Sequence, residues 1–94
     1  MPYRILSTPH FDRDYKSLAR RTPGAISHVE AMVEVLREDP YARSGRHNIK
    51  KLKGMKKGEG QWRIVSGDYR IRYDVLEKNV VLYSCKPRRE AYRG

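Results

Sequence analysis

The sequence predicts an α+β protein in which an N-terminal strand and a helical hairpin pack on a small twisted antiparallel β-sheet. Two observations support this fold class. Apolar residues recur at helical spacing in the first half of the chain, and short segments with strand-like alternation, separated by turn residues, occupy the last third. A length of 94 residues suits one hydrophobic core, so we expect residues 1–94 to form a single domain.

The chain begins with a predicted strand and a predicted helix. Residues 3–6 form a short apolar segment that is typical of a strand. Ser7 or Thr8 then offers a hydroxyl for an N-cap, and Pro9 suits the first helical position, where an N–H has no partner within the helix. The apolar residues that follow lie on one face of this helix: Phe11, Tyr15 and Leu18.

A second helix is predicted directly after the first. Residues 22–24, Thr-Pro-Gly, are expected to end the first helix and to begin the second with the same hydroxyl and proline arrangement. The core-facing residues of the second helix recur at helical spacing: Ile26, Val29, Val33 and Leu36. Asp39 and Pro40 end it, because a proline disfavours helical geometry in the residue before it. The two helices therefore form an antiparallel hairpin.

Residues 40–60 form a long, basic connection that contains several glycines. A short strand or turn is expected around Ile49 and Leu52, the apolar residues within it. Long connections inside compact domains are often functional, so this segment is a candidate binding loop.

The C-terminal third is predicted to form three antiparallel strands, at residues 61–65, 69–76 and 80–85. If residues 67–68 form a two-residue turn, Trp62 faces Tyr73 on one side of the sheet. A shift by one residue would mix apolar and charged side chains on both faces, so this register is favoured. Trp62 is therefore predicted to pack in the core rather than to stack on a base.

The other side of the same two strands displays three arginines. In the predicted register Arg63 faces Arg72, and Arg70 lies two residues away from Arg72 on the same face. Like charges that face each other destabilise a sheet, so a bound polyanion is expected to compensate them. The alternative is a surface salt-bridge network with Asp74 and Glu77.

The charge of the chain is concentrated in one region. The formal net charge is +10, and residues 43–72 alone contain ten basic and two acidic side chains, a net charge of +8. Residues 1–42 contain six basic and six acidic side chains and are neutral overall. A basic surface of this density is typical of proteins that bind phosphates, and it favours a nucleic acid as partner.

Other function classes are disfavoured by the sequence. No apolar segment reaches the roughly 18 residues of a membrane span, and the N-terminus lacks the apolar region of a signal peptide, so a cytoplasmic protein is expected. The single Cys85 cannot form an internal disulfide and is expected to be a buried strand thiol. Acidic residues and histidines do not cluster at metal-ligand spacing, so we expect neither a metal nor another cofactor.

Five short motifs then follow one another along the second half of the chain: KLKG at 51–54, WRI at 62–64, GDYRIRY at 67–73, VVLY at 80–83 and RREAYR at 88–93. Together with the helical hairpin, they resemble the RelE/ParE toxin superfamily over essentially the whole chain. The resemblance implies a RelE-like fold, a toxin of a type II toxin–antitoxin system, and a cognate RelB-like antitoxin. RelE-type members cleave mRNA in the A site of the 70S ribosome, and we expect this activity. The alternatives are a ParE-like inhibitor of DNA gyrase, which is not an enzyme, and a non-catalytic module that binds RNA or the ribosome.

The resemblance also implies which residues act on RNA. The catalytic candidates are arginines of the strands and of the C-terminal segment, with a late tyrosine: Arg63, Arg70, Arg88, Arg89 and Tyr92. The RNA-binding candidates are further basic residues of the connection and the strands: Lys50, Lys51, Lys53, Lys56, Lys57, Arg72 and Lys86. Either Arg88 or Arg89 matches the C-terminal arginine of the family. Val65 departs from the RelE pattern, which has a second basic residue there, and Lys53 or Arg72 is expected to replace that charge.

Cleavage of RNA by its own 2′-hydroxyl needs a base, stabilisation of the extra negative charge on the phosphate, and a proton for the departing 5′ oxygen. Arginines suit the second task because they stay charged and bind phosphate oxygens in a fork. The predicted base is Tyr92, or a lysine such as Lys53 with a lowered pKa. His47, in the basic connection, is the histidine alternative. The chain lacks a terminal His-Tyr pair, so it does not resemble members that use a Glu/His acid–base pair.

Overall fold

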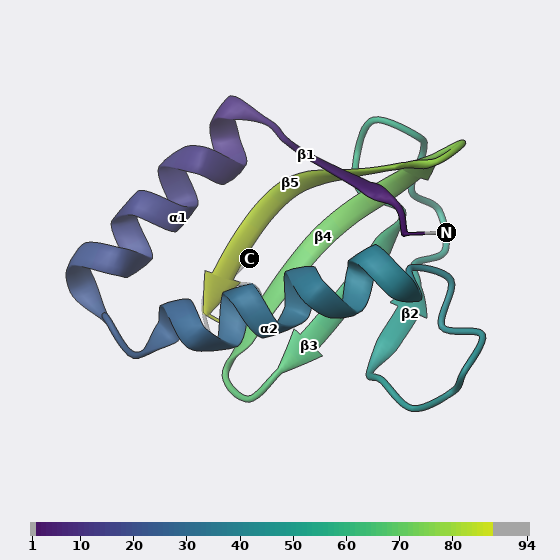
Figure 1. Cartoon of the computed structure of the whole chain (residues 1–94). Helices are drawn as coiled ribbons and strands as arrows, with labels where there is room; N and C mark the ends of the chain where they lie inside the picture. The colour runs from purple at the N-terminus through teal and green to yellow at the C-terminus, as the bar shows by residue number, and fades with distance from the viewer. Residues whose placement is uncertain (1, 88–94) are drawn as a thin grey trace.

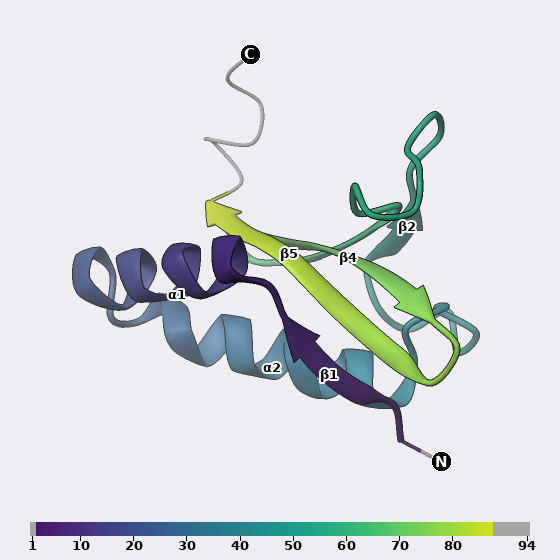
Figure 2. The same cartoon turned by 90° about the horizontal axis from the view of Figure 1, so that it is seen from above.

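The computed structural model describes residues 2–87 (Figure 1). Its helices and strands, in chain order, are β1 (Arg4–Ser7), α1 (Pro9–Arg21), α2 (Ala25–Glu38), β2 (Ile49–Lys51), β3 (Trp62–Ser66), β4 (Tyr69–Leu76) and β5 (Asn79–Pro87). The strands form one sheet in the order β1-β5-β4-β3-β2. Both helices lie on the same side of this sheet (Figure 1, Figure 2). The predicted α+β fold class is confirmed.

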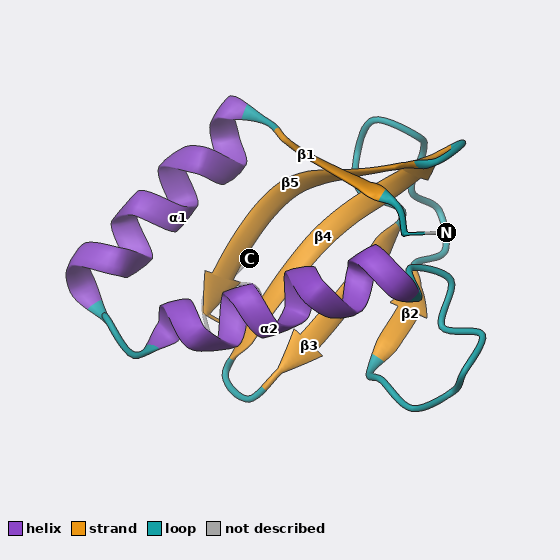
Figure 3. Cartoon of the chain, viewed as in Figure 1, coloured by secondary structure: helices purple, strands orange, loops and turns teal. Residues whose placement is uncertain are grey.

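The sheet is mixed rather than purely antiparallel. β2, β3, β4 and β5 pair antiparallel, as predicted, whereas β1 pairs parallel to β5, with Arg4 opposite Asn79 and Ser7 opposite Leu82. After β1 the chain passes through the two helices and the long connection before it enters β2 at the opposite edge of the sheet (Figure 3). A crossover of this kind allows parallel pairing, which a short hairpin does not.

The two helices begin in different ways. Thr8 is the N-cap of α1, its hydroxyl accepts a hydrogen bond from the Phe11 N–H at 3.2 Å, and Pro9 occupies the first turn, as predicted. The predicted start of α2 is wrong. Its N-cap is Gly24, which has no side chain to cap the helix, and the turn is closed instead by the Ala25 N–H, which donates to the Thr22 carbonyl at 2.8 Å.

The core lies between the helices and the sheet. The predicted apolar stripes face it: Phe11 and Leu18 of α1, together with Val29 and Leu36 of α2, are buried. On the sheet, the buried apolar residues are those of the predicted apolar alternation, with Ile71 and Tyr73 both 0% exposed. The core therefore forms between the apolar faces of the predicted helices and the apolar face of the predicted strands.

The predicted register of β3 and β4 is confirmed. Trp62 is opposite Tyr73 and Ile64 is opposite Ile71, and the turn at residues 67–68 has Gly67 at φ +59°. Trp62 packs against the core, with its ring centroid 6.5 Å from that of Tyr73 in a stacked arrangement. These contacts confirm that Trp62 packs in the core.

β5 contains an irregularity that affects the site. Arg72 pairs with Ser84 and Tyr73 pairs with Leu82, so Tyr83 is an extra residue in β5 at this point. Such bulges increase the local twist and redirect side chains. None of the helices in residues 2–87 is long and apolar enough to cross a membrane.

Candidate nucleic-acid interface

The candidate site is the face of the sheet opposite the helices, called the open face below. It includes the side chains of Lys50, Arg63, Val65, Arg70, Arg72, Asp74, Val81, Ser84 and Lys86, which alternate with the core residues. One cross-strand row joins Lys50, Arg63 and Arg72, and the next row joins Val65, Arg70 and Lys86. Five of these nine residues are therefore basic and stand on adjacent strands.

Close spacing makes this face strongly cationic. Neighbouring strands lie about 4.8 Å apart, so Lys50, Arg63 and Arg72 are consecutive neighbours across the sheet. Like charges at directly opposed positions repel one another by about 0.2–1 kcal/mol per pair. Within residues 2–87, the Arg63 guanidinium forms no hydrogen bond or ion pair. A ligand with several negative charges would relieve this repulsion.

Arg72 differs from Arg63 because its guanidinium binds the protein backbone. Its Nη2 donates to the Glu59 carbonyl and to the Gly60 carbonyl, both at 2.8 Å, and its Nε donates to the Gly60 carbonyl at 3.3 Å. The residue predicted to contact RNA thus lies beneath the connection that leads into β3.

The alternative to a bound polyanion, a surface salt-bridge network that includes Asp74, does not fit the position of this residue. Its side chain is 0% exposed and accepts hydrogen bonds from the Gly58 and Gln61 N–H groups, both at 2.6 Å. Neither Asp74 nor Glu77 forms an ion pair with Arg63 or Arg72 within the described part of the chain. The sequence indicates the contact of Asp74 with this loop only by placing an acidic residue where the alternation of β4 otherwise places arginines.

The lysines predicted to bind RNA lie in different parts of the structure. Lys53, Lys56 and Lys57 are exposed in the connection between β2 and β3. Lys51 points to the helix side of the sheet, where its Nζ lies 5.8 Å from the Trp62 ring centroid, so the structure separates it from the arginines.

Lys86 lies at the β5 end of the open face. It is opposite Arg70, and its Nζ is 3.7 Å from a carboxylate oxygen of Asp14 in α1. The other carboxylate oxygen of Asp14 accepts a hydrogen bond from the Cys85 N–H at 3.1 Å. Asp14 therefore fixes the end of β5. The candidates Arg88, Arg89 and Tyr92 lie outside the described residues.

Two described residues, Tyr83 and His47, are poorly suited to act as the base in the reaction. Burial raises the pKa of Tyr83, and the Asp74 carboxylate and its hydrogen bond raise it further. His47 lines a pocket of about 190 Å³ with Ala31 and Met32 of α2, which places it on the helix side of the sheet. Sequence reasoning had not considered Tyr83, which the bulge brings to the carboxylate of Asp74.

Cys85 is a buried thiol, as predicted. It is 1% exposed, and burial raises its pKa from 9.0 to about 12, with the Asp14 carboxylate adding to the shift. No group of three or more His, Cys, Asp or Glu side chains in residues 2–87 is arranged to hold a metal ion. The chemistry available on the described part of the open face is therefore that of fixed positive charges.

A helical layer on one side of a mixed sheet and an arginine-rich surface on the other define a class of small, basic α+β proteins. The chain belongs to the ParE toxin family: the model described as ParE toxin of the type II toxin–antitoxin system parDE matches residues 5–92. The resemblance to the RelE/ParE superfamily is thereby confirmed. Comparison with curated protein sequences finds no match.

Solved structures of toxins share the fold. YafQ in the DinJ–YafQ toxin–antitoxin complex from E. coli matches with a TM-score of 0.73 at 17% identity, over 100% of both chains. RelE in the archaeal RelE–RelB complex from Pyrococcus horikoshii OT3 matches with a TM-score of 0.68 at 23% identity, also over 100% of both chains. The YoeB dimer from Staphylococcus aureus matches with a TM-score of 0.70 at 20% identity, over 92% of this chain and 97% of that chain. At these identities the likeness establishes the fold.

Proposed function

We propose that this type II toxin is a ribosome-dependent endoribonuclease that cleaves mRNA in the A site, in the cytoplasm, without a metal ion. The observation that carries the proposal is the open face. Lys50 is directly opposite Arg63, and Arg70 lies in the next cross-strand row on the same face, the side of the sheet without helices. A surface of this kind suits a chain of phosphates, because each phosphate that binds relieves repulsion between neighbouring cations.

In the proposed reaction the 2′-hydroxyl oxygen attacks the adjacent phosphorus, and the bond from phosphorus to the 5′ oxygen breaks. Arg63 and Arg70 bind the non-bridging phosphate oxygens and stabilise the charge that develops on them. Tyr92, or Lys53, accepts the 2′ proton, and Arg88 or Arg89 stabilises the departing 5′ oxygen, which takes a proton from water and leaves as a hydroxyl group. The supporting geometry is that β5 ends at Pro87, opposite Tyr69 and next to the row of Arg70.

The proposed protein partner is a RelB-like antitoxin. Two of the structural matches, RelE and YafQ, were crystallised with their antitoxins. For this chain we propose that the antitoxin neutralises the toxin by covering the open face or by displacing the C-terminal segment. The +8 net charge of residues 43–72 would attract an acidic partner that folds upon binding.

A second candidate function is inhibition of DNA gyrase without catalysis. The family description favours it, because the matched model is named for the ParE toxin. Val65 also favours it, since this open-face residue is apolar where the RelE pattern has a basic one. The open face argues for RNA cleavage, because a gyrase inhibitor needs no arginines in adjacent cross-strand positions.

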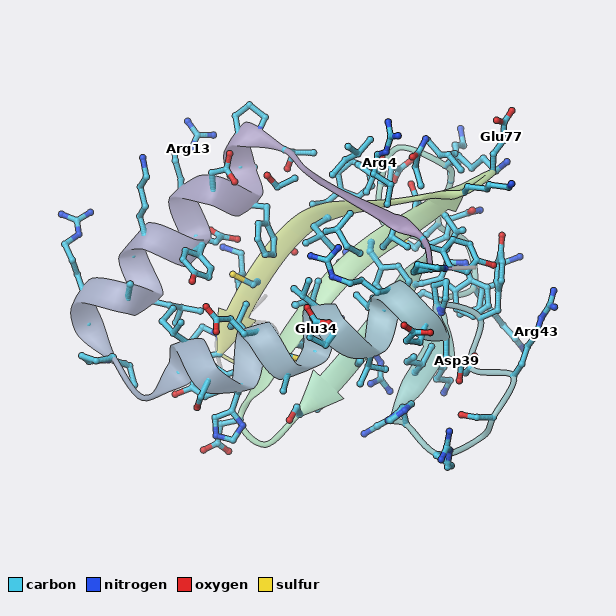
Figure 4. All side chains as sticks on the ribbon, viewed as in Figure 1. Arg4, Arg13, Glu34, Asp39, Arg43 and Glu77 are labelled. Atoms are coloured by element: carbon cyan, nitrogen blue, oxygen red, sulfur yellow. The ribbon has the colours of Figure 1, made fainter. Side chains whose placement is uncertain are left out.

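The test is cleavage of a defined mRNA with and without programmed ribosomes, by the wild type and by Arg70→Ala. Arg13→Ala is the matched control, because it removes the same charge from the outer surface of α1, away from the sheet (Figure 4). We expect ribosome-dependent cleavage in the A-site codon that falls by at least about a hundredfold in Arg70→Ala and is unchanged in Arg13→Ala. A wild type that arrests growth without cleaving mRNA would contradict the proposal and favour gyrase.

A further inference from the structure

The segment between β2 and β3 is a defined loop rather than a loose connection. The Leu52 N–H donates to the Gln61 carbonyl at 2.7 Å and closes the base of residues 52–61, called the lysine loop below because it contains Lys53, Lys56 and Lys57. The loop stands on the side of the sheet opposite the helices (Figure 2). It therefore borders the open face.

The loop is ordered from within by two contacts. The Glu59 N–H donates to the Lys56 carbonyl at 3.0 Å, and the Gln61 side-chain amide donates to the Met55 carbonyl at 3.1 Å. These bonds give the segment between Met55 and Gln61 a fixed turn, with Lys56 and Lys57 exposed. Neither bond attaches the loop to the sheet.

That attachment comes from Asp74. Each of its two carboxylate oxygens accepts one backbone hydrogen bond, from Gly58 and from Gln61. A fully buried carboxylate needs such partners, because an unpaired buried charge is strongly destabilising. Hydrogen bonds to an ionised acceptor are also stronger than neutral ones.

Arg72 attaches the loop as a hydrogen-bond donor, whereas Asp74 attaches it as an acceptor. It donates to the carbonyls of Glu59 and Gly60, which lie between the two N–H groups that Asp74 binds. The four consecutive residues 58–61 therefore each give one backbone group to a side chain of β4. The Arg72 guanidinium thus binds carbonyl groups of this segment, and the Asp74 carboxylate, two residues further along β4, binds its N–H groups.

The glycines of the loop are consistent with this attachment. Gly58 has a φ of +93°, which lets its N–H point to Asp74. Gly60 has a φ of +83° and is buried, and a Cβ there would lie 3.1 Å from the Cβ of Arg72. Glycine adopts such geometry without the strain that other residues incur, and at residue 60 a side chain would also be crowded by Arg72.

We infer that Asp74 and Arg72 are positioning residues that hold the lysine loop against the sheet, so that its lysines extend the RNA-binding surface of Arg63. This inference rests on the proposed RNA-binding function. It assigns Arg72 to the loop backbone instead of to phosphate. It also gives an acidic residue a favourable role in binding a polyanion.

The direction in which one substitution changes the affinity for RNA distinguishes this role from a simple charge effect. Asp74→Asn removes a negative charge, which by electrostatics alone would strengthen RNA binding. Asn also cannot accept at both positions, because one of its two polar atoms is an N–H donor that would face a backbone N–H. If Asp74 positions the loop, the variant binds RNA more weakly although its net charge is more positive.

The experiment measures binding of an unstructured single-stranded RNA oligonucleotide across a range of salt concentrations, together with amide hydrogen exchange at Gly58 and Gln61. Glu77→Gln is the matched control, because Glu77 is exposed at the turn after β4 and its substitution removes the same charge (Figure 4). We expect Asp74→Asn to bind about fivefold to tenfold more weakly than wild type, with a salt slope smaller by about one. Its amides at Gly58 and Gln61 should exchange faster, and Glu77→Gln should bind as tightly as wild type or more tightly.

A second pair of variants applies if Asp74→Asn fails to fold. Gly58→Ala strains the residue that donates to Asp74, and Gly45→Ala introduces the same strain at a φ of +70° in a different part of the basic connection. A Cβ at either position meets nothing within 4 Å. We expect weaker RNA binding in Gly58→Ala than in Gly45→Ala. Conversely, equal binding by this pair would contradict the inference.

Two further outcomes would overturn the inference and one would overturn the proposed function. Asp74→Asn that binds RNA as tightly as Glu77→Gln would show that the loop position does not matter for binding. Slow exchange at Gly58 and Gln61 in Asp74→Asn would show that the carboxylate does not hold the loop. A wild type with slow exchange at both amides but no affinity for RNA would contradict the RNA-binding function, while the role of Asp74 in the loop would stand.

Discussion

The two faces of β4 show how differently one strand can use the same alternation. On the helix side, Ile71, Tyr73 and Val75 are buried against apolar side chains of the helices and the neighbouring strands. On the open face, Arg72 and Asp74 bind backbone groups of residues 58–61, a segment more than ten positions away in the chain. The helix face is stabilised mainly by non-directional packing, with one buried hydrogen bond from the Tyr73 hydroxyl to the Pro40 carbonyl at 2.8 Å, whereas the open face depends on several hydrogen bonds to the backbone.

This difference decides what a substitution should do. Apolar packing is proportional to buried area, so a truncation on the helix face should reduce the free energy of unfolding and leave RNA binding by the folded protein unchanged. The cations of the open face repel one another, so removal of one should weaken RNA binding and change stability little. Stability and RNA binding should therefore separate according to face.

The largest expected effect on stability is that of Ile71→Ala. Ile71 is 0% exposed, so the substitution should lower the free energy of unfolding by about 2–5 kcal/mol, through lost burial and the cavity that remains. Val65→Ala is the control on the open face and should cost less, because Val65 is only partly buried. Urea unfolding of both variants measures the difference, and equal losses would contradict the assignment of the faces.

The helix face was largely predictable from the sequence. The period of the apolar residues alone indicated two helices and three strands, and the chemistry of both faces fixed the register of Trp62 with Tyr73. Thr8 and Pro9 were sufficient to place the start of α1, because that cap depends on adjacent residues. Where the same motif precedes α2, the N-cap lies two residues later, at Gly24 instead of Thr22.

Long-range contacts were not predictable in this way. The parallel pairing of β1 with β5 joins residues more than seventy positions apart, and no local signal specifies it. The sequence indicated that Asp74 shares a face with the arginines, but not that a loop covers it. Burial of that residue depends on where the glycines direct the loop, which is a property of the folded chain.

A smaller effect on stability is expected from pH, through Cys85 on the helix face. Because burial raises the pKa of the thiol from 9.0 to about 12, the folded state keeps a proton that the unfolded state loses above pH 9. The contribution of this thiol to stability is thus complete below pH 9 and falls as the pH rises from 9 towards 12. Denaturant unfolding between pH 8 and 10.5 should show a smaller decline in Cys85→Ala than in wild type. Identical declines would mean that this thiol is not the group responsible for the loss of stability at high pH.

The smallest expected effect on stability, with a large one on RNA binding, belongs to Arg63→Gln. This variant relieves repulsion with Lys50 and Arg72 and should raise the free energy of unfolding by at most about 1 kcal/mol, and by less at high salt. Lys51→Gln is the matched control, since Lys51 is opposite the neighbouring residue Trp62 and points to the helix side.

Both variants lose one positive charge, so any difference between them reports position rather than net charge. We expect Arg63→Gln to weaken binding of single-stranded RNA and Lys51→Gln to change it much less, as measured by titration at a fixed salt concentration. If Lys51→Gln weakened RNA binding as much as Arg63→Gln, the basic surface would have to extend around the β2 edge to both faces. The separation between the faces would then hold for packing but not for recognition, because the edge strand would present its lysines to the same RNA from both sides.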